Sequence, residues 1–580
     1  MMHTVETVLL VLLLGALTGI IARYIRAIPL PLIQIALGAA IAWPQGGLHI
    51  AFDPELFMLL FIPPLLFADG WRIPKREFFA LARPILLLAL GLVLFTVVGL
   101  GYLINWMIPE IPLTVAFALA AVVSPTDAVA VSAITRSLGM PDKTMHILEG
   151  ESLLNDASGL VALKFAVAAT LTGALSWTEV AKDFVWMSVG GLGVGALIGW
   201  GFSYARSTIT RRLGDVAATQ MVLLLVLLPF AAYILGEKMG VSGILSAVAA
   251  GIATNFSDLD RSSYVSERLQ TAGTWSLVEA AFNGAIFLLL GLQLPSIIGV
   301  PLQKAGHEWW ILVGYVAAIS FALLLLRWIW LTLGVQGALL RAHRLGKMAE
   351  RPSQLLNLAT TFAGIRGAVT LAGALSVPML MNNGEPFPAR DMLIFLATGT
   401  ILFTLVLGSI ALPLLLRHMP APGESPTLRE ERIAREASCN AAMGALKLSD
   451  EEVQTHTPEW VAMHQEVLGH LMQEYRNRLQ LLDDGTGTAT SLEMQREQPE
   501  VVLQRKLRYV YEIEMRLRCI RAERDAIYAE RHKHRINDES LRSLVSELDL
   551  QEVSMRKRLV AARKATEVVA RKLHTDNDTA

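Results

Sequence analysis

Long apolar stretches alternate with short polar loops from the start of the chain to about residue 417. A helix needs about 20 apolar residues to cross the hydrocarbon of a bilayer, which is the length of most of these stretches. A soluble helix would show a charged face, whereas residues 84–102 carry no charged side chain. We therefore expect an all-α membrane protein with about thirteen transmembrane helices. Their predicted ranges are 5–22, 28–43, 54–70, 84–106, 111–136, 145–174, 183–205, 217–236, 239–256, 273–298, 309–335, 355–382 and 391–416.

The charged residues divide the chain into two parts. Residues 1–417 hold 25 Lys or Arg and 23 Asp or Glu, and the 163 residues of 418–580 hold 25 and 28. The sequence predicts a transmembrane domain over 1–417 and a water-soluble domain over 418–580. Both parts are close to neutral, which argues against nucleic acid as a partner and leaves the lipid bilayer as the expected surroundings.

The loops predict how the chain is oriented. Loops after odd-numbered stretches hold seventeen Lys or Arg, and loops after even-numbered stretches hold four, namely Lys182, Lys238, Lys304 and Arg390. Basic loops stay on the cytoplasmic side, so the N-terminus is expected outside and the C-terminal part in the cytoplasm. No basic segment precedes the first stretch, so we expect an uncleaved helix rather than a signal peptide. The expected location is the cell (inner) membrane, crossed many times.

The charged C-terminal part reads as soluble helix. Apolar residues recur at helical spacings from Leu503 to Ile527 and again from Leu541 to Leu559. Asn537 and Asp538 could cap the second helix, and Asp483–Thr488 resembles a loop. We interpret this cytoplasmic α-helical domain as a regulatory or dimerisation module.

Charged residues within membrane-spanning stretches usually line a pathway or pair with each other, because each costs roughly 2.5–3.5 kcal/mol to insert. They are Asp127, Glu151, Asp156, Lys164, Glu279 and Arg366. Arg327 lies near the end of its stretch, so we expect its side chain to extend toward the membrane surface. We expect Lys164 to pair with an acid and Glu279, which shares a helix face with Asn283, to cross-link helices.

Two of the predicted spans contain helix breakers near their middle. The fifth contains Ser124-Pro125-Thr126-Asp127, and the twelfth contains Gly364-Ile365-Arg366-Gly367. The two spans lie seven apart and run in opposite directions, as two inverted six-helix repeats would require. Crossed broken helices at such positions indicate a transporter's central site. Asp127 and Arg366 would neutralise the partial charges of the helix ends, which is itself a structural role.

The sixth predicted span places oxygen-bearing side chains together. Ser152 and Asp156 share one helix face, and Glu151 and Asn155 share another. Asp156 would lie about 16 Å into a hydrocarbon core roughly 30 Å thick. Its carboxylate can bind a small cation beside hydroxyl and amide oxygens, or it can bind a proton. One site with two mutually exclusive occupants is the minimum that exchange requires.

Three sequence stretches carry a resemblance to a known family. SPTDAV at Ser124–Val129, GESLLND at Gly150–Asp156 and GIRGAVT at Gly364–Thr370 occur in this order on three predicted spans. In these three stretches the chain resembles bacterial sodium/proton exchangers of the monovalent cation:proton antiporter superfamily. They belong to its NhaP-like branch, which is related to animal sodium/hydrogen exchangers. The resemblance covers the whole predicted membrane part.

The resemblance implies a mechanism and a set of roles. Asp156 would bind Na⁺ or a proton, with Ser152, Asp127, Thr126 and Asn155 completing the cation/proton site. Glu151 would pair with Arg366 to hold the core together. The family works as a homodimer with elevator-type alternating access. Asn155 before Asp156 resembles the electroneutral group, which exchanges one cation for one proton.

The sequence therefore predicts a secondary active antiporter that exchanges a monovalent cation, sodium first and Li⁺ or K⁺ as alternatives, for protons, in the service of sodium transport and pH homeostasis. Two other classes stay open. A sodium-coupled solute symporter needs a pocket for an organic substrate, and a cation channel with a helical sensor tail needs a continuous pore. No nucleophile, phosphate or metal-cofactor motif is present, so we expect neither an enzyme nor a bound cofactor.

Overall fold

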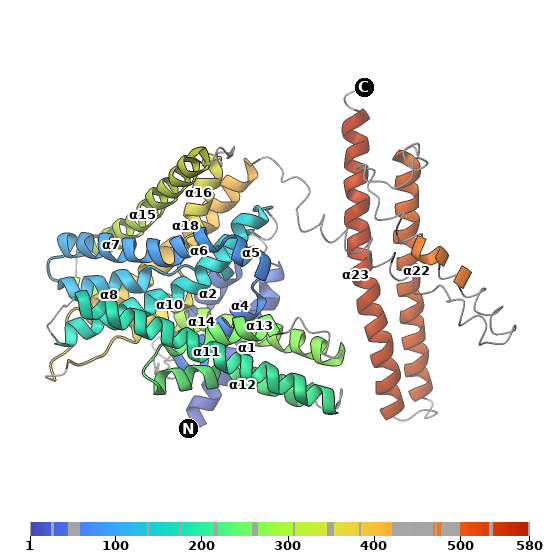
Figure 1. Ribbon diagram of the computed structural model, residues 1–580, viewed down its shortest axis with the longest axis horizontal. Coiled ribbons are helices and arrows are strands. Elements are labelled where there is room, and N and C mark those ends of the chain that lie inside the picture. Colours follow the sequence, from blue (N-terminus) through green and yellow to red (C-terminus); the bar gives the residue numbers. More distant parts are fainter. Residues whose placement is uncertain are drawn as a thin grey trace. The chain divides into compact units, whose positions relative to one another are not determined.

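The computed structural model divides the chain into two compact units, Met1–Gly423 and Glu424–Ala580. It describes residues 2–419 except 25–27, 44–57, 136–137, 173–176, 214–217, 258–264, 306–307, 345–352 and 382–383. In the second unit it describes chiefly 499–532 and 538–577, with isolated short pieces between 440 and 479. The described secondary structure is helical in both units (Figure 1). This agrees with the predicted all-α class.

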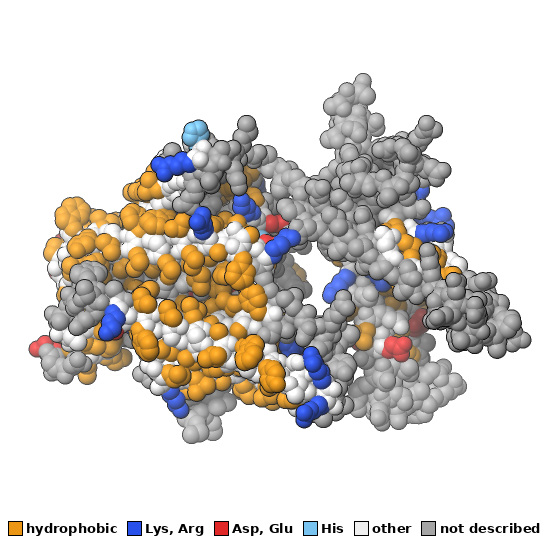
Figure 2. Space-filling view, viewed as in Figure 1, with side chains coloured by type: hydrophobic (Ala, Val, Ile, Leu, Met, Phe, Trp, Pro, Cys, Tyr) orange, Lys and Arg blue, Asp and Glu red, His pale blue; other side chains and the backbone are white. Residues whose placement is uncertain are grey.

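The first unit has the helices of a membrane protein. Eight described helices are long and apolar enough to cross a bilayer, and three shorter apolar helices cover 9–22, 30–42 and 243–256. In the face shown in Figure 2, apolar side chains form a broad band over this unit, and most visible Lys and Arg lie at its margins. The count of thirteen crossings, the inverted repeats and the orientation remain predictions.

Seven of these helices pack together in what we call the companion bundle. Within it α11 packs on α13, α13 on α4 and α12, and α14 on α1 and α2. The helices are α1 (Met2–Tyr24), α2 (Leu30–Ala42), α4 (Ile62–Arg72), α11 (Trp177–Leu213), α12 (Ala218–Lys238), α13 (Gly243–Ser257) and α14 (Val265–Ala305).

Small residues set the closest packing in the companion bundle. Gly191, Gly195 and Gly199 recur every four residues and lie on one face of α11. A Cβ atom on Gly195 would lie 2.0 Å from the carbonyl oxygen of Ser246 in α13. In lipid, helices associate through such backbone contacts, because burying apolar side chains there gains little. The spacing of these glycines therefore fixes how α11 and α13 pack.

The remaining helices of the first unit form what we call the crossing bundle. Within it α8 packs on α7 and α10, and α18 packs on α15 and α16. The helices are α5 (Lys75–Ala80), α6 (Ala82–Leu86), a π-helical segment (Leu87–Leu92), α7 (Val93–Met107), α8 (Leu113–Val123), α9 (Ala128–Thr135), α10 (Asp142–Thr172), α15 (Trp309–Arg344), α16 (Gln354–Phe362), α17 (Ala368–Leu375) and α18 (Arg390–Arg417).

Both predicted helix interruptions are present in the crossing bundle. α8 ends at Val123 and α9 begins at Ala128, so the non-helical segment coincides with Ser124–Asp127. α16 ends at Phe362 and α17 begins at Ala368, which leaves residues 363–367 outside the helices. Pro125 and the glycines at 364 and 367 explain why helix stops here, since proline lacks a donor and glycine favours non-helical backbone.

The second unit contains a pair of long helices, α22 (Pro499–His532) and α23 (Asp538–Asn577). They pack side by side in Figure 1, and ion pairs between Arg563 and Glu514 and between Arg524 and Asp549 show that they run antiparallel. Ile513, Leu517, Ile520 and Leu548 are buried, as their spacing predicts. Leu507, expected in the same stripe, is exposed. Asp483–Thr488 and Asn537 lie outside the described residues.

Candidate cation and proton site

The two helix interruptions meet directly. The backbone N–H of Asp127 donates to the carbonyl oxygen of Ile365 at 2.7 Å. A Cβ atom on Gly367 would lie 2.0 Å from Oδ2 of Asp127, so only a glycine allows this approach. The structure thus brings together two segments separated by some 240 residues, and it does so at the residues that the sequence singled out.

Charged groups satisfy the broken helix ends. Oδ1 of Asp127 accepts hydrogen bonds from the N–H groups of Val129 and Ala130 at 2.9 and 3.0 Å, in the first turn of α9. Nε of Arg366 donates to the carbonyl of Val123, the last residue of α8, at 2.8 Å. The Arg366 guanidinium also donates to the carbonyl of Gly364, just beyond α16. An acid therefore caps one positive helix end, and a base faces two negative ends, as helix dipoles favour.

The predicted ion pair between Glu151 and Arg366 is wrong. Glu151 is 1 % exposed and binds Arg327 instead, through both carboxylate oxygens, with Nη2 of Arg327 2.8 Å from Oε2. Nε of Arg327 also donates to the carbonyl of Thr360 at 3.1 Å. Arg327 was expected to extend to the membrane surface, but it is 1 % exposed. The guanidinium of Arg366 is occupied by helix-end carbonyls, and this leaves Glu151 for the other buried arginine.

The polar residues of α10 hold the first interruption in place. Oγ of Ser152 donates to the carbonyl of Thr126 at 2.8 Å and lies 3.3 Å from the N–H of Ala128, from which it accepts. Nδ2 of Asn155 donates to Oγ1 of Thr126 at 2.8 Å. The hydroxyl of Thr126 is 3.4 Å from Oε1 of Glu151. Ser152, Asn155 and Thr126 therefore form one buried network around the break.

Asp156 differs from its neighbours because its carboxylate makes no hydrogen bond or ion pair with any residue that the structure describes. It is 8 % exposed, and Asp127 and Asp69 are close enough for their charges to act on it. A buried carboxylate without a partner is costly unless a proton or a cation neutralises it. The Oδ1 atom of Asn155, one residue away, is also buried and unpartnered among the described residues. These oxygens have unused capacity to accept a proton or coordinate a cation.

The acidic side chains near Asp156 differ in their exposure. Asp69 on α4 and Glu149 on α10 are exposed, and Asp127 is half-buried. In the other direction along α10, Leu160, Val161 and Leu163 are buried. Asp69 was not among the membrane charges predicted from the sequence. The rule for charges inside membrane spans could have found it, since it lies in the third predicted span, one residue before the span's end.

Lys164 and Glu279 both have ion-pair partners. Nζ of Lys164 is 2.9 Å from Oε1 of Glu237 on α12, and Glu279 on α14 pairs with Arg72 at the end of α4. Lys164 was expected to pair with an acid and Glu279 to cross-link helices, and the structure shows both. The Glu279 pair lies within the companion bundle, whereas the Lys164 pair joins the two bundles.

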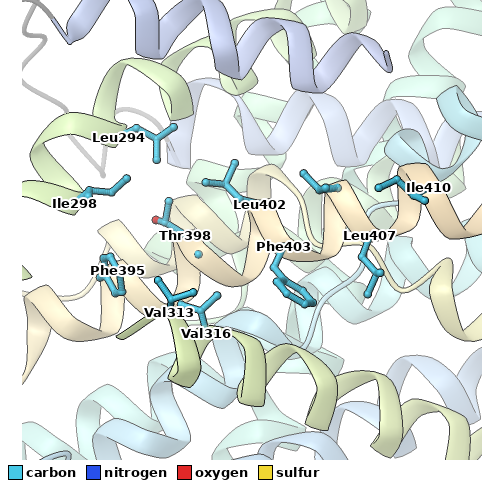
Figure 3. A pocket seen from close by; sticks show the side chains of 12 residues that line it. Leu294, Ile298, Val313, Val316, Phe395, Thr398, Leu402, Phe403, Leu407 and Ile410 are labelled. Carbon is cyan, nitrogen blue, oxygen red and sulfur yellow. The ribbon is translucent and has the colours of Figure 1, made fainter. Parts of the chain in front are cut away.

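An apolar cavity of about 470 Å³ lies elsewhere, between α14, α15 and α18 (Figure 3). Its twelve lining residues include no charged side chain and none of the residues around Asp156. The hydroxyl of Thr398, which points into this region, has no partner among the described residues. Such a lining does not suit a cation, so the cavity is separate from the candidate site.

Comparison with known proteins identifies relatives of this chain. The family described as "Sodium/hydrogen exchanger, transmembrane" matches residues 9–418. The chain is 43 % identical over 555 residues to the uncharacterized Na⁺/H⁺ exchanger YjcE of Escherichia coli K12, covering 94 % of this chain and 98 % of that one. It is 45 % identical over 411 residues to the sodium, potassium, lithium and rubidium/H⁺ antiporter of Bacillus subtilis, covering 70 % of this chain and 61 % of that protein.

A solved structure has the same fold. The sodium proton antiporter MjNhaP1 of Methanocaldococcus jannaschii superposes with a TM-score of 0.55 at 19 % identity, covering 72 % of this chain and 98 % of that one. The family match covers most of the chain, and the E. coli relative aligns over nearly its full length. The chain therefore belongs to the transmembrane sodium/hydrogen exchanger family.

Proposed function

We propose that the chain is an antiporter in which Asp156 binds either one monovalent cation or one proton, and never both. One observation carries the proposal: Asp156 is buried, has no partner among the described residues, and lies beside the contact between two broken helices. The hydroxyl and carbonyl oxygens of Ser152 and Thr126 and the amide oxygen of Asn155 are the hard ligands that a small cation prefers. Asp127 and Arg366 hold the backbone around them.

The proposed substrates are protons and monovalent cations. Sodium is the first candidate because the family is named for it, and lithium follows as the smaller ion. Two Bacillus relatives are named as antiporters for sodium, potassium, lithium and rubidium, and they align with 412 and 411 residues of this chain. We therefore include potassium among the cations that it exchanges.

We further propose that access to Asp156 alternates by movement of the crossing bundle against the companion bundle. In this proposal the structure represents the cytoplasm-facing form, because Asp69 and Glu149 are exposed and the loop charges predict that their side is cytoplasmic. The two bundles are each held together by their own ion pairs, Arg327–Glu151 in one and Arg206–Glu267 in the other. Assembly as a homodimer in the cell membrane completes the proposal.

Proton flux in everted membrane vesicles tests this function. Sodium, lithium and potassium are added in turn, and the collapse of a preformed proton gradient is followed with a fluorescent dye. Asp156→Asn keeps the size of the side chain and loses its charge and titration, so we expect folded, inserted protein with no exchange. Ser158→Ala, two residues after Asp156 on α10, is the matched control; the Ser158 hydroxyl donates to the carbonyl of Ala89, and the variant should retain exchange. Substantial exchange by Asp156→Asn would exclude Asp156 as the binding carboxylate.

A further inference from the structure

The ion pair between Lys164 and Glu237 has one partner in each bundle. Nζ of Lys164 on α10 lies 2.9 Å from Oε1 and 3.2 Å from Oε2 of Glu237 on α12. Among the ion pairs described above, Arg327–Glu151 lies within the crossing bundle, and Arg72–Glu279 and Arg206–Glu267 lie within the companion bundle. The Lys164 pair is therefore placed to respond to movement between the bundles.

The position of Lys164 along α10 shows on which side of Asp156 the pair lies. Lys164 follows Asp156 by eight residues, which is about 12 Å along the helix. Glu149, on the exposed side, precedes Asp156 by seven residues. Between Asp156 and Lys164 the apolar residues Leu160, Val161 and Leu163 are buried. The pair thus lies beyond these buried residues, on the opposite side of Asp156 from Glu149.

Glu237 is held in place by its own bundle. Its Oε1 atom accepts a hydrogen bond at 3.2 Å from the N–H of Gly243, the first residue of α13. This helix N-terminus favours a carboxylate. Lys164 instead belongs to α10, which is one continuous helix from Asp142 to Thr172 and also carries Asp156. A shift of α10 relative to α12 carries Lys164 together with Asp156, and it breaks the 2.9 Å contact once the shift exceeds the reach of the lysine side chain.

We propose that Lys164 and Glu237 form a gate that keeps this side of Asp156 closed and so determines the apparent cation affinity at each face of the membrane. The inference rests on the proposed exchange by bundle movement. Breaking the pair favours the opposite-facing form, in which Asp156 is reached from the Lys164 side. The two side chains are 42 % and 37 % exposed, so the effect on the equilibrium is modest, about two- to fivefold.

The first test compares sodium affinity at the two faces. KM for sodium is measured in everted vesicles and in right-side-out vesicles, after wild-type exchange has been established in both. We expect Lys164→Gln to raise KM about two- to fivefold at the cytoplasmic face and to lower it at the outer face. Lys164→Glu, which places two carboxylates together, should shift both further. The double variant Lys164→Glu/Glu237→Lys, in which the two charges are swapped, should restore both KM values to within about twofold of the wild type.

Lys182→Gln serves as the matched control, because Lys182 is an exposed lysine of α11 on the same predicted side. It should leave both KM values unchanged. If KM changes equally and in the same direction at both faces, or does not change in any Lys164 variant, the pair only stabilises the packing of the helices. Either result would overturn the proposed gate. Absence of exchange in the wild type would instead count against the proposed function, so the two failures are distinct.

A second test covers the case in which the charge variants fold poorly. Lys164→Cys and Glu237→Cys are combined in a chain whose two native cysteines are replaced by serine, and the pair is joined with a reducible bifunctional thiol reagent. We expect cross-linked protein to lose exchange by at least about tenfold, and reduction to restore it. Full exchange by quantitatively cross-linked protein would mean that α10 and α12 do not separate there, and it would overturn the proposal.

Discussion

At the scale of single residues, a buried pair of opposite charges fixes the centre of the crossing bundle. Glu151 and Arg327 are both 1 % exposed and bind through two parallel contacts. Paired guanidinium and carboxylate groups tolerate burial only when their remaining hydrogen-bonding groups are satisfied, and Arg327 meets this condition through the carbonyl of Thr360. Arg366, 3 % exposed, uses backbone carbonyls instead of a carboxylate.

A double-mutant cycle distinguishes these two arginines. Glu151→Gln leaves the Arg327 guanidinium buried without its counter-charge, which typically costs about 3–5 kcal/mol, and removing both charges costs less. We expect thermal unfolding in detergent to show strong coupling between Glu151→Gln and Arg327→Met. Coupling between Glu151→Gln and Arg366→Met should be weaker, because no ion pair joins those residues among the described contacts. Stronger coupling of Glu151→Gln to Arg366→Met than to Arg327→Met would support the Glu151–Arg366 pair that was expected from the sequence.

The error over Glu151 shows what sequence patterns cannot decide at this scale. The sequence identifies charges that must be neutralised within the membrane, but two arginines were available for one glutamate. The choice depends on where Arg327 lies when α15 packs beside α16, and helical spacing within a single span does not contain that information. Asp69 was missed for a related reason, since its position near a predicted span end hid its proximity to Asp127 and Asp156.

At the scale of elements, the interrupted helices were predictable because local chemistry causes them. Proline at position 125 and glycines at 364 and 367 stop a helix whatever its tertiary surroundings, and both breaks occur where they were expected. The ends of the other helices could be predicted less closely from the sequence. The contact of Lys164 on α10 with Glu237 on α12 could not be derived from spacing within one helix.

Gly367 offers a prediction on how the two interruptions meet. A methyl group at this position would overlap the Asp127 carboxylate, with the Cβ atom 2.0 Å from Oδ2, so the backbone contact between Asp127 and Ile365 must open. We expect Gly367→Ala to abolish exchange and to lower the unfolding temperature in detergent. Gly334→Ala is the control, because nothing lies within 4 Å of its added Cβ atom. Normal exchange by Gly367→Ala would contradict the crossing geometry.

The hairpin of α22 and α23 yields a prediction on pH. Arg524 and Arg556 donate hydrogen bonds to Glu552 and hold the pKa of its carboxyl below its ordinary value. A carboxyl whose pKa is lowered by folding stabilises the folded form above its unfolded pKa of about 4.3, and this stabilisation is lost as pH falls through the lower folded value. Protection of both helices from hydrogen exchange should therefore decrease over that acidic range.

Two variants of the full-length protein test the origin of this pH dependence. Glu552→Gln cannot titrate, so its hairpin should be less protected than the wild type at neutral pH and should change less on acidification. Glu512→Gln removes an exposed carboxylate that pairs with Arg516 on the same helix, and it should keep the wild-type profile. If Glu552→Gln loses protection on acidification as steeply as the wild type, another group is responsible.

At the scale of the whole molecule, the packing supplies two bundles and a site between broken helices, and the proposed exchange uses both. Asp156, on α10, belongs to the crossing bundle, and the exposed Asp69, on α4, belongs to the companion bundle. Carboxylates from both bundles thus lie near the site. The cycle's stoichiometry depends on how many of these groups change occupant during one turnover.

Charge counting gives the expected stoichiometry. If only Asp156 changes occupant, one cation neutralises it in one direction and one proton in the other. The crossing bundle then carries the same net charge both ways, and the membrane potential does no work. Asn155, the residue before Asp156, cannot titrate. A net charge moved per cycle would couple to voltage by about 2.3 kcal/mol per 100 mV.

We therefore predict electroneutral exchange of one cation for one proton. In proteoliposomes, a sodium gradient should drive the same proton movement with the potential clamped at zero or at about −100 mV. On a solid-supported membrane, sodium jumps should give at most a brief current. A sustained sodium-dependent current, or an equilibrium that shifts with voltage, would show that a second group titrates. Asp69→Asn would then test which group it is, because Asp69 is an exposed carboxylate whose charge acts on Asp156. Loss of the current with retained exchange would assign the second proton to Asp69.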